Sequence, residues 1–245
     1  MLEKEGMNMY KAVIFDMDGT ILNTIEDLNG SLNYALKETG HRHDLQVEDT
    51  KICFGSGVKV AITRALCLET GMKEEDLYVI GTSAEVLPAS VSNEEINRVQ
   101  KVFRVYYVNH CKIKTSPYPG ILELLRKLRE LHIKIAVVSN KQNDAVEKLV
   151  KDQFNGYFDF YLGEKSGIKR KPAADMCNQC LSVLDVKREE ALYVGDSEID
   201  IETGANAHMD VVAVNWGFRT TSFLKKHHAK TIVSNTDELR DAILK

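Results

Sequence analysis

The chain has 245 residues, of which 44% are hydrophobic and 28% charged, and its formal net charge is −4. This composition is typical of a globular protein that buries a sizeable core in one large or two small domains. The acidic balance argues against nucleic acid as the main partner, and no apolar run is long enough to span a membrane. The polar, acidic N-terminus does not resemble a signal peptide, so we expect a cytoplasmic location.

Residues 12–15 form a short apolar run, which we interpret as a strand buried on both faces. Asp16 follows directly, Asp18 comes two residues later, and Gly19 ends the run with a turn. The carboxyl ends of strands in open parallel sheets are where ligands bind, so the two carboxylates mark a candidate site. Such a pair repels unless a cation or a proton lies between the two groups. The alternative is a plain Asp-Gly turn at a strand end.

The stretch from 24 to 111 predicts only helices and loops. Thr24 and Asp27 have the spacing of a capping box, and one apolar face predicts a helix that closes at Gly40. Residues 41–54 are polar and mixed. Further helices are predicted after Gly57 to near 71, over about 74–87, and from a second capping box at 92–95 onward.

Beyond Pro117, strand and helix patterns alternate. The apolar runs predict strands at 134–139, 158–162, 191–195 and 211–214, with an edge strand at 231–233. The helical patterns between and after them cover 121–131, 143–153, 173–184, 198–207, 222–226 and 236–244. Cys177 and Cys180 have a CxxC spacing, but no second pair or histidine cluster completes a zinc site, so we assign both to a helix that packs on the core.

Alternation of strands and helices indicates a parallel sheet with right-handed crossovers. About ninety residues of helix follow the first strand, which is more than one crossover needs. We therefore predict an α/β fold, with a Rossmann-like doubly wound parallel sheet built from residues 9–22 and 116–245. An all-helical cap domain is inserted over 23–115, and its two linkers would act as a hinge.

Polar side chains stand where several of these strands end or are about to begin: Ser139, Asn140 and Lys141 after one strand, Asp196 and Asp200 after another, and Lys171 in the segment between them. Parallel strands bring their carboxyl ends to one edge, so we expect these groups to meet Asp16 and Asp18. Carboxylates that bind Mg²⁺, together with a lysine and a hydroxyl that bind phosphate, suit metal-assisted phosphoryl transfer.

Four motifs resemble the haloacid dehalogenase superfamily, in its subgroup of phosphoglycolate phosphatases: Asp16-Met-Asp-Gly-Thr20, Ser139, Lys171-Pro172 and Gly195-Asp-Ser-Glu-Ile-Asp200. They occur in the order and spacing of that subgroup, and the resemblance covers roughly residues 10 to 240. It implies a magnesium-dependent phosphatase for a small phosphorylated metabolite, with phosphoglycolate as the first candidate. The reaction would pass through an aspartyl-phosphate intermediate.

The resemblance also implies a role for each residue. The catalytic set would be Asp16 as nucleophile, Asp18 as general acid and base, and Lys171 and Ser139 as partners of the phosphoryl group. Thr20 and Asn140 would bind substrate, and the magnesium ligands would be Asp16, Asp18, Asp196 and Asp200, the last through water. In the cap, Lys59 follows the Gly55–Gly57 loop and is a candidate for the substrate's carboxylate, although a solvated lysine at a helix start is an equally good interpretation.

Other functions fit the same motifs. The scaffold would also suit a nucleotide or sugar-phosphate phosphatase, a pyrophosphatase or a β-phosphoglucomutase-like phosphomutase. A catalytically idle phosphate-binding protein is a further alternative, against which the intact Asp16, Asp18, Lys171 and Asp196 argue. A dinucleotide-binding oxidoreductase is disfavoured because no G-x-G-x-x-G follows the first strand. We expect a monomer or a homodimer, without a nucleic-acid or membrane partner.

Overall fold

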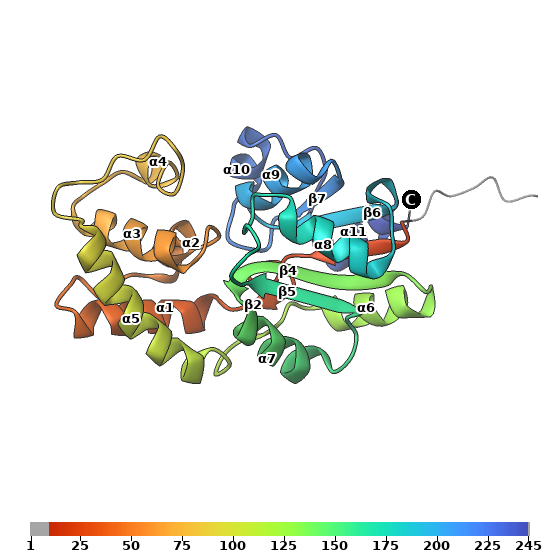
Figure 1. The fold of residues 1–245 in the computed structure, drawn as a ribbon, viewed down its shortest axis with the longest axis horizontal. Coiled ribbons are helices and arrows are strands. Elements are labelled where there is room, and N and C mark those ends of the chain that lie inside the picture. The colour runs from red at the N-terminus through yellow and green to blue at the C-terminus, as the bar shows by residue number, and fades with distance from the viewer. Residues whose placement is uncertain (1–9, 245) are drawn as a thin grey trace, which may run out of the picture. The chain divides into compact units, whose positions relative to one another are not determined.

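The computed structural model describes residues 10–244, which divide into two compact units (Figure 1). Of these residues, one unit comprises 10–22 and 117–244, and the other comprises Asn23–Ser116. Two short strands, β2 (Leu22–Asn23) and β3 (Ser116–Pro117), pair with each other where the chain passes between the units.

The first unit is built on a six-stranded sheet in the order β5-β4-β1-β6-β7-β8. Its strands are β1 (Ala12–Phe15), β4 (Lys134–Gln142), β5 (Phe160–Glu164), β6 (Ala191–Gly195), β7 (Asp210–Val214) and β8 (Ile232–Val233). All neighbouring strands are parallel, which confirms the predicted α/β fold class. The chain order reverses beside β1, and such a switch point is where doubly wound sheets bind ligands.

Side chains of β1 alternate between two cores, as a strand buried on both faces requires. Val13 and Phe15 join a cluster with α6 (Ile121–Glu130), α7 (Asn143–Phe154) and α11 (Thr236–Ile243). Ala12 and Ile14 join a cluster on the opposite face with α8 (Asp175–Leu184) and the end of α9 (Glu198–Ala207). The sheet thus lies between helices in this unit (Figure 1). Strand β1 has two strands on one side and three on the other.

Smaller elements complete this unit. A 3₁₀ turn (η1, Arg188–Glu190) precedes β6, and α10 (Thr221–Lys226) follows the loop after β7. Cys177 and Cys180 are free, buried and part of the α8 core, as the interpretation of their spacing required. Strand β4 runs three residues beyond its predicted end, and its register against β5 breaks between Val138 and Gln142.

The second unit is helical. It contains α1 (Ile25–Glu38), α2 (Val47–Cys53), α3 (Val58–Glu69), α4 (Glu74–Leu77) and α5 (Asn93–His110). Leu32, Ile62, Val99 and Phe103 from three of these helices are fully or almost fully buried. Among the helices of residues 10–244, none combines the length and apolar character needed to cross a membrane.

One helix of this unit is shorter than predicted, and another lies in a segment for which no element was predicted. The helix expected over about 74–87 ends at Leu77, and turns follow it, in which Gly81 has a φ of +94° that interrupts a helix. The mixed segment 41–54 contains α2, whose start is fixed because the Gln46 amide donates to Asp49 at 2.8 Å.

The predicted capping box at Thr24 does not form either. Thr24 is the N-cap of α1, but its side chain makes no capping hydrogen bond. Asp27 instead accepts hydrogen bonds from the amides of Lys114 (3.0 Å) and Thr115 (2.9 Å) and from the Thr115 hydroxyl (2.8 Å). This carboxylate therefore joins the first and last segments of the helical unit, a role that no local spacing reveals.

We expect Asp27→Ala to lower the free energy of unfolding by about 1–3 kcal/mol, because three donors around a buried carboxylate lose their acceptor. The matched control is Glu26→Ala, which removes only the exposed ion pair with Nζ of Lys114 at 2.6 Å. Urea denaturation followed by circular dichroism measures both variants. Equal losses for the two substitutions would contradict the role of Asp27.

Candidate active site

Asp16 lies at the carboxyl end of the central strand, and its backbone is fixed there. Its amide donates to the carbonyl of Val194 at 2.8 Å, which extends the pairing of β1 with β6 by one residue. The following loop turns back at once, because the Gly19 amide donates to Leu22 and the Leu22 amide donates to Met17, at 2.9 and 3.0 Å. The loop therefore holds Asp16 and Asp18 at the edge of the sheet.

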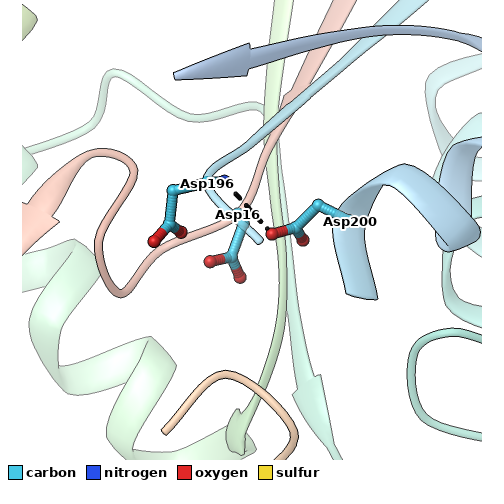
Figure 2. Close-up of side chains that lie close together, drawn as sticks. All are labelled: Asp16, Asp196 and Asp200. Carbon is cyan, nitrogen blue, oxygen red and sulfur yellow. Dashed lines mark hydrogen bonds between the residues drawn. The ribbon is translucent and has the colours of Figure 1, made fainter. Parts of the chain in front are cut away.

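Three buried carboxylates meet at this edge. Asp16, Asp196 and Asp200 each offer an oxygen within 4.8 Å of the others (Figure 2). Asp196 follows β6 directly, and Asp200 lies in the first turn of α9. The sequence prediction that the ends of β1 and β6 converge is thus met by the fold.

Asp196 is oriented by the loops on both sides of it. Its Oδ1 accepts a hydrogen bond from the Thr20 hydroxyl at 3.0 Å, and its Oδ2 accepts one from the Phe218 amide at 2.7 Å. Gly19 has a φ of +87° and lies so close that a Cβ there would be 2.3 Å from Asp196 Oδ2. The hydroxyl of Thr20, predicted to bind substrate, is therefore engaged with Asp196 in this structure.

Asp200 is fully occupied by hydrogen-bond donors. Its Oδ2 accepts from the amides of Asp196 (3.2 Å) and Ser197 (3.0 Å) and from the Ser197 hydroxyl (2.6 Å). Its Oδ1 accepts from Lys171 Nζ (2.7 Å) and the Tyr193 hydroxyl (3.1 Å). Asp200 thus caps α9 and holds the lysine, and its predicted contact with a metal through water remains a prediction.

Lys171 is the cation at the centre of the cluster, and its side chain is buried. Its ammonium donates to Asp16 Oδ1 at 2.6 Å, to Asp200 Oδ1 at 2.7 Å and to the Tyr193 hydroxyl at 3.1 Å. An ammonium has three protons, and here each has an acceptor. Tyr193 was not singled out in the sequence, because it stands inside the apolar run that forms β6.

Burial at this edge of the sheet shifts the pKa values of its ionisable groups. Burial raises the pKa of Asp16 to about 7, although Lys171 acts in the opposite direction. Burial, with Asp200 and Asp16 nearby, also raises the pKa of Asp196 well above its ordinary value. For Lys171 burial acts to lower the pKa, but Asp16 and Asp200 together raise it above its ordinary value. Clustered carboxylates with raised pKa values fit a divalent cation that prefers oxygen ligands.

The end of β4 adds a hydroxyl, an amide and a second lysine. Ser139 Oγ accepts a hydrogen bond from the Lys141 amide at 3.2 Å, and Asn140 Nδ2 donates to the carbonyl of Lys171 at 3.0 Å. Asn140 therefore connects β4 to the segment that carries Lys171. The ammonium of Lys141 forms an ion pair with Asp18, with Nζ 2.9 Å from Oδ1.

The loop after β7 closes over the cluster through contacts that the sequence did not reveal. Arg219 and Glu198 form a buried ion pair, with Nε donating to Oε2 at 2.8 Å. Trp216 Nε1 donates to the carbonyl of Thr20 at 3.0 Å, so this side chain supports the first loop. The signal was the place of Glu198 inside the last motif and of Trp216 in the loop after β7, but spacing alone does not name their partners.

The predicted residues thus fall into two groups. The first unit brings together the predicted catalytic, phosphate-binding and metal-binding residues of the strand ends: Asp16, Asp18, Thr20, Ser139, Asn140, Lys171, Asp196 and Asp200. Lys59 is exposed on α3 of the helical unit, and its substrate role remains a prediction. Arg64, one turn further, is buried and donates to the carbonyls of Ile52 and Ile80, at 3.2 and 3.3 Å.

Comparison with known proteins agrees with this geometry. Residues 13–214 match the family of haloacid dehalogenase-like hydrolases. A phosphoglycolate phosphatase from Aquifex aeolicus is 30% identical over 210 residues, which are 85% of this chain and 86% of that protein. A pyrophosphatase, PpaX, provisionally assigned in Caldanaerobacter subterraneus subsp. tengcongensis, is 29% identical over 88% of this chain and 86% of its own length.

A solved structure extends the likeness to the whole fold. A protein from Lactobacillus delbrueckii subsp. bulgaricus, provisionally described as a phosphoglycolate phosphatase, is 57% identical, with a TM-score of 0.95. The likeness covers 96% of this chain and 99% of that one.

The fold and the acidic, lysine-containing edge define a hydrolase that uses carboxylate chemistry at the end of a parallel sheet. The chain belongs to the haloacid dehalogenase-like hydrolases, and within them it is a phosphatase that resembles the phosphoglycolate phosphatases.

We expect Lys171→Met to lower the free energy of unfolding by about 3–5 kcal/mol at neutral pH, because two buried carboxylates lose their common cation. Lys169→Met is the matched control, since Lys169 is an exposed lysine two residues away. Chemical denaturation in the presence of a chelator measures both variants. A Lys171→Met protein as stable as Lys169→Met would show that the ion pairs contribute nothing to the fold.

The raised pKa of Asp16 predicts how stability varies with pH in the absence of metal. Its carboxyl has a pKa of about 7 in the folded chain against an ordinary 3.8, so the neutral form favours folding. This contribution is complete at low pH and is lost as the pH rises from about 4 to about 7. We expect the unfolding free energy of the wild type to fall more steeply across this range than that of Asp16→Asn, by at most about 1.4 kcal/mol per pH unit. Identical slopes in chelator would contradict the shift.

Proposed function

We propose that the protein is a magnesium-dependent phosphomonoester hydrolase that forms an aspartyl phosphate on Asp16. The observation that carries this proposal is the contact of Asp16 Oδ1 with Lys171 at 2.6 Å, beside the buried carboxylate of Asp196. One oxygen of Asp16 is thereby held, and the carboxylate is aimed at the edge where a phosphoryl group would bind. Such a held carboxylate is suited to attack phosphorus.

The remaining groups supply the other steps. The ammonium of Lys171 lowers the repulsion between Asp16 and an anionic phosphoryl group, and the Ser139 hydroxyl and the end of β4 bind its oxygens. Asp18 gives a proton to the leaving oxygen and later takes one from the water that hydrolyses the acyl phosphate. Thr20 acts by orienting Asp196, with which it shares a hydrogen bond of 3.0 Å.

The donor set supports magnesium as the ion. Asp16, Asp18 and Asp196 would hold it, with Asp200 behind them, since Asp200 already accepts five hydrogen bonds. When bound, the ion would neutralise charge on the phosphoryl oxygens and on the clustered carboxylates. Burial raises the pKa of Asp196, which means that its charged form is disfavoured there. A bound cation would offset this penalty.

For the substrate we infer a small phosphorylated metabolite, with phosphoglycolate first. The support is the name shared by the Aquifex aeolicus relative and several others that are 24–28% identical to this chain. The helical unit would act as the cap that selects the substrate, with Lys59 as the candidate contact for a carboxylate. A pyrophosphatase activity is the second candidate, because the PpaX relative is nearly as similar as the Aquifex aeolicus protein. The five buried free cysteines favour a cytoplasmic location.

A panel of phosphorylated compounds tests the proposal: phosphoglycolate, pyrophosphate, sugar phosphates, nucleoside monophosphates and p-nitrophenyl phosphate, each with magnesium and with excess chelator. We expect the highest kcat/KM with phosphoglycolate, loss of activity in chelator, and no turnover by Asp16→Asn. Mass spectrometry of the quenched wild type should detect phosphate on Asp16.

The results distinguish the proposed mechanism from the proposed substrate. Preference for pyrophosphate or a sugar phosphate would replace the substrate and keep the mechanism. Full activity of Asp16→Asn, or full activity in chelator, would overturn the mechanism itself.

A further inference from the structure

A second buried lysine lies at the site, and the four motifs assign it no function. Lys141 is the penultimate residue of β4, and its side chain is only 7% exposed. Its Nζ lies 2.9 Å from Oδ1 of Asp18, whose side chain is 18% exposed. A lysine with its ammonium this deep in a protein is expected to have a defined partner.

The backbone fixes Lys141 from two sides. Its amide donates to the hydroxyl of Ser139 at 3.2 Å, within the last part of β4. On the other side Gly163 of β5 lies so close that a Cβ there would be 2.6 Å from the carbonyl oxygen of Lys141. The register of β4 against β5 breaks in this segment, and the break re-aims the side chains at the strand end.

Each of the two reacting carboxylates contacts a different lysine. Lys171 contacts Asp16 and Asp200, whereas Lys141 contacts Asp18. Oδ1 of Asp18 is buried and accepts no hydrogen bond of regular geometry from residues 10–244, so the ammonium of Lys141 is the group that compensates its charge. A carboxylate held by a fixed cation keeps one orientation, because rotating it away would break the ion pair.

We propose that Lys141 is a positioning residue that holds the carboxylate of Asp18 for hydrolysis of the aspartyl phosphate. The inference rests on the proposed function. In that step the oxygen of water attacks phosphorus, the bond from phosphorus to the Asp16 oxygen breaks, and its electron pair returns to the Asp16 carboxylate. One proton of the water passes to Asp18, and inorganic phosphate leaves. The ion pair contains Asp18 as a carboxylate, which is the form that accepts this proton.

The proposal predicts a selective defect. Without the ammonium, Asp18 loses its fixed orientation, so the second half of the reaction slows. Formation of the aspartyl phosphate from p-nitrophenyl phosphate is spared, because p-nitrophenolate is a good leaving group that hardly needs a proton donor. A lysine with only a structural role would slow both halves together.

The test is stopped-flow release of p-nitrophenolate by the wild type and by Lys141→Met, with magnesium present. For Lys141→Met we expect an initial burst of about one product per enzyme at a near wild-type rate, then a steady state at least about tenfold slower, within the range for loss of base catalysis. In steady-state terms kcat falls, whereas kcat/KM changes by less than about threefold. Lys141→Arg, which keeps the charge, should restore much of kcat.

Matched controls distinguish the proposal from a loss of structure. Lys165→Met removes an exposed lysine just after β5 and should behave as wild type. Lys141→Gln repeats the loss of charge with a polar side chain, in case Lys141→Met does not fold. Asp18→Asn should give the same burst with a deeper loss of kcat. An equal fall of kcat and kcat/KM without a burst, or unchanged kcat, in the folded Lys141 variants would overturn the proposal.

Failure of the proposed function would be visible elsewhere. It would appear as turnover by Asp16→Asn, or as absence of phosphate on Asp16 in the quenched wild type. Failure of the inference alone would leave both of those results intact and change only the behaviour of the Lys141 variants.

Discussion

The ammonium of Lys171 is the contact on which the rest of the site depends. It joins Asp16 at the end of β1, Asp200 at the start of α9 and Tyr193 within β6, all at 2.6–3.1 Å. Burying a charge is unfavourable unless it is paired and its protons have acceptors, and here all three protons do. Because these partners come from separate elements, the ion pairs only form once β1 and β6 have paired. The active edge is therefore a product of the assembled sheet.

The need to compensate buried charge also explains why small residues and backbone amides surround the carboxylates. Asp200 accepts the amides of Asp196 and Ser197, so one side chain caps α9 and orders the loop that presents Asp196. Gly19 permits that presentation, since any side chain there would overlap Asp196. The field of oriented amides and hydroxyls replaces the water that the carboxylates lost on burial. The loop after β7 then encloses Asp196 through the Phe218 amide.

What the sequence could predict, and what it could not, follows from how far each feature depends on distant residues. The strands and Asp16 were predictable because a buried parallel strand is a continuous apolar run and its end is marked by a polar residue. The contacts of Asp27, Tyr193 and Lys141 were not, because each joins segments far apart in the chain or depends on a break in register. Asp27 illustrates the point: its spacing from Thr24 suits a cap, but the amides of residues 114–115 bind it instead.

Two carboxylates two residues apart present a problem that the structure resolves with two cations. Asp16 and Asp18 repel, and a single lysine between them would hold both in one fixed relation. The structure pairs Asp16 with Lys171, which lies in the segment before α8, and Asp18 with Lys141, which lies near the end of β4. The nucleophile and the proton-transfer group are thereby oriented independently, so one can change its bonding during the reaction while the other stays in place. A metal ion would add to this arrangement a further positive charge beside Asp16 and Asp196, which belong to the buried acidic cluster.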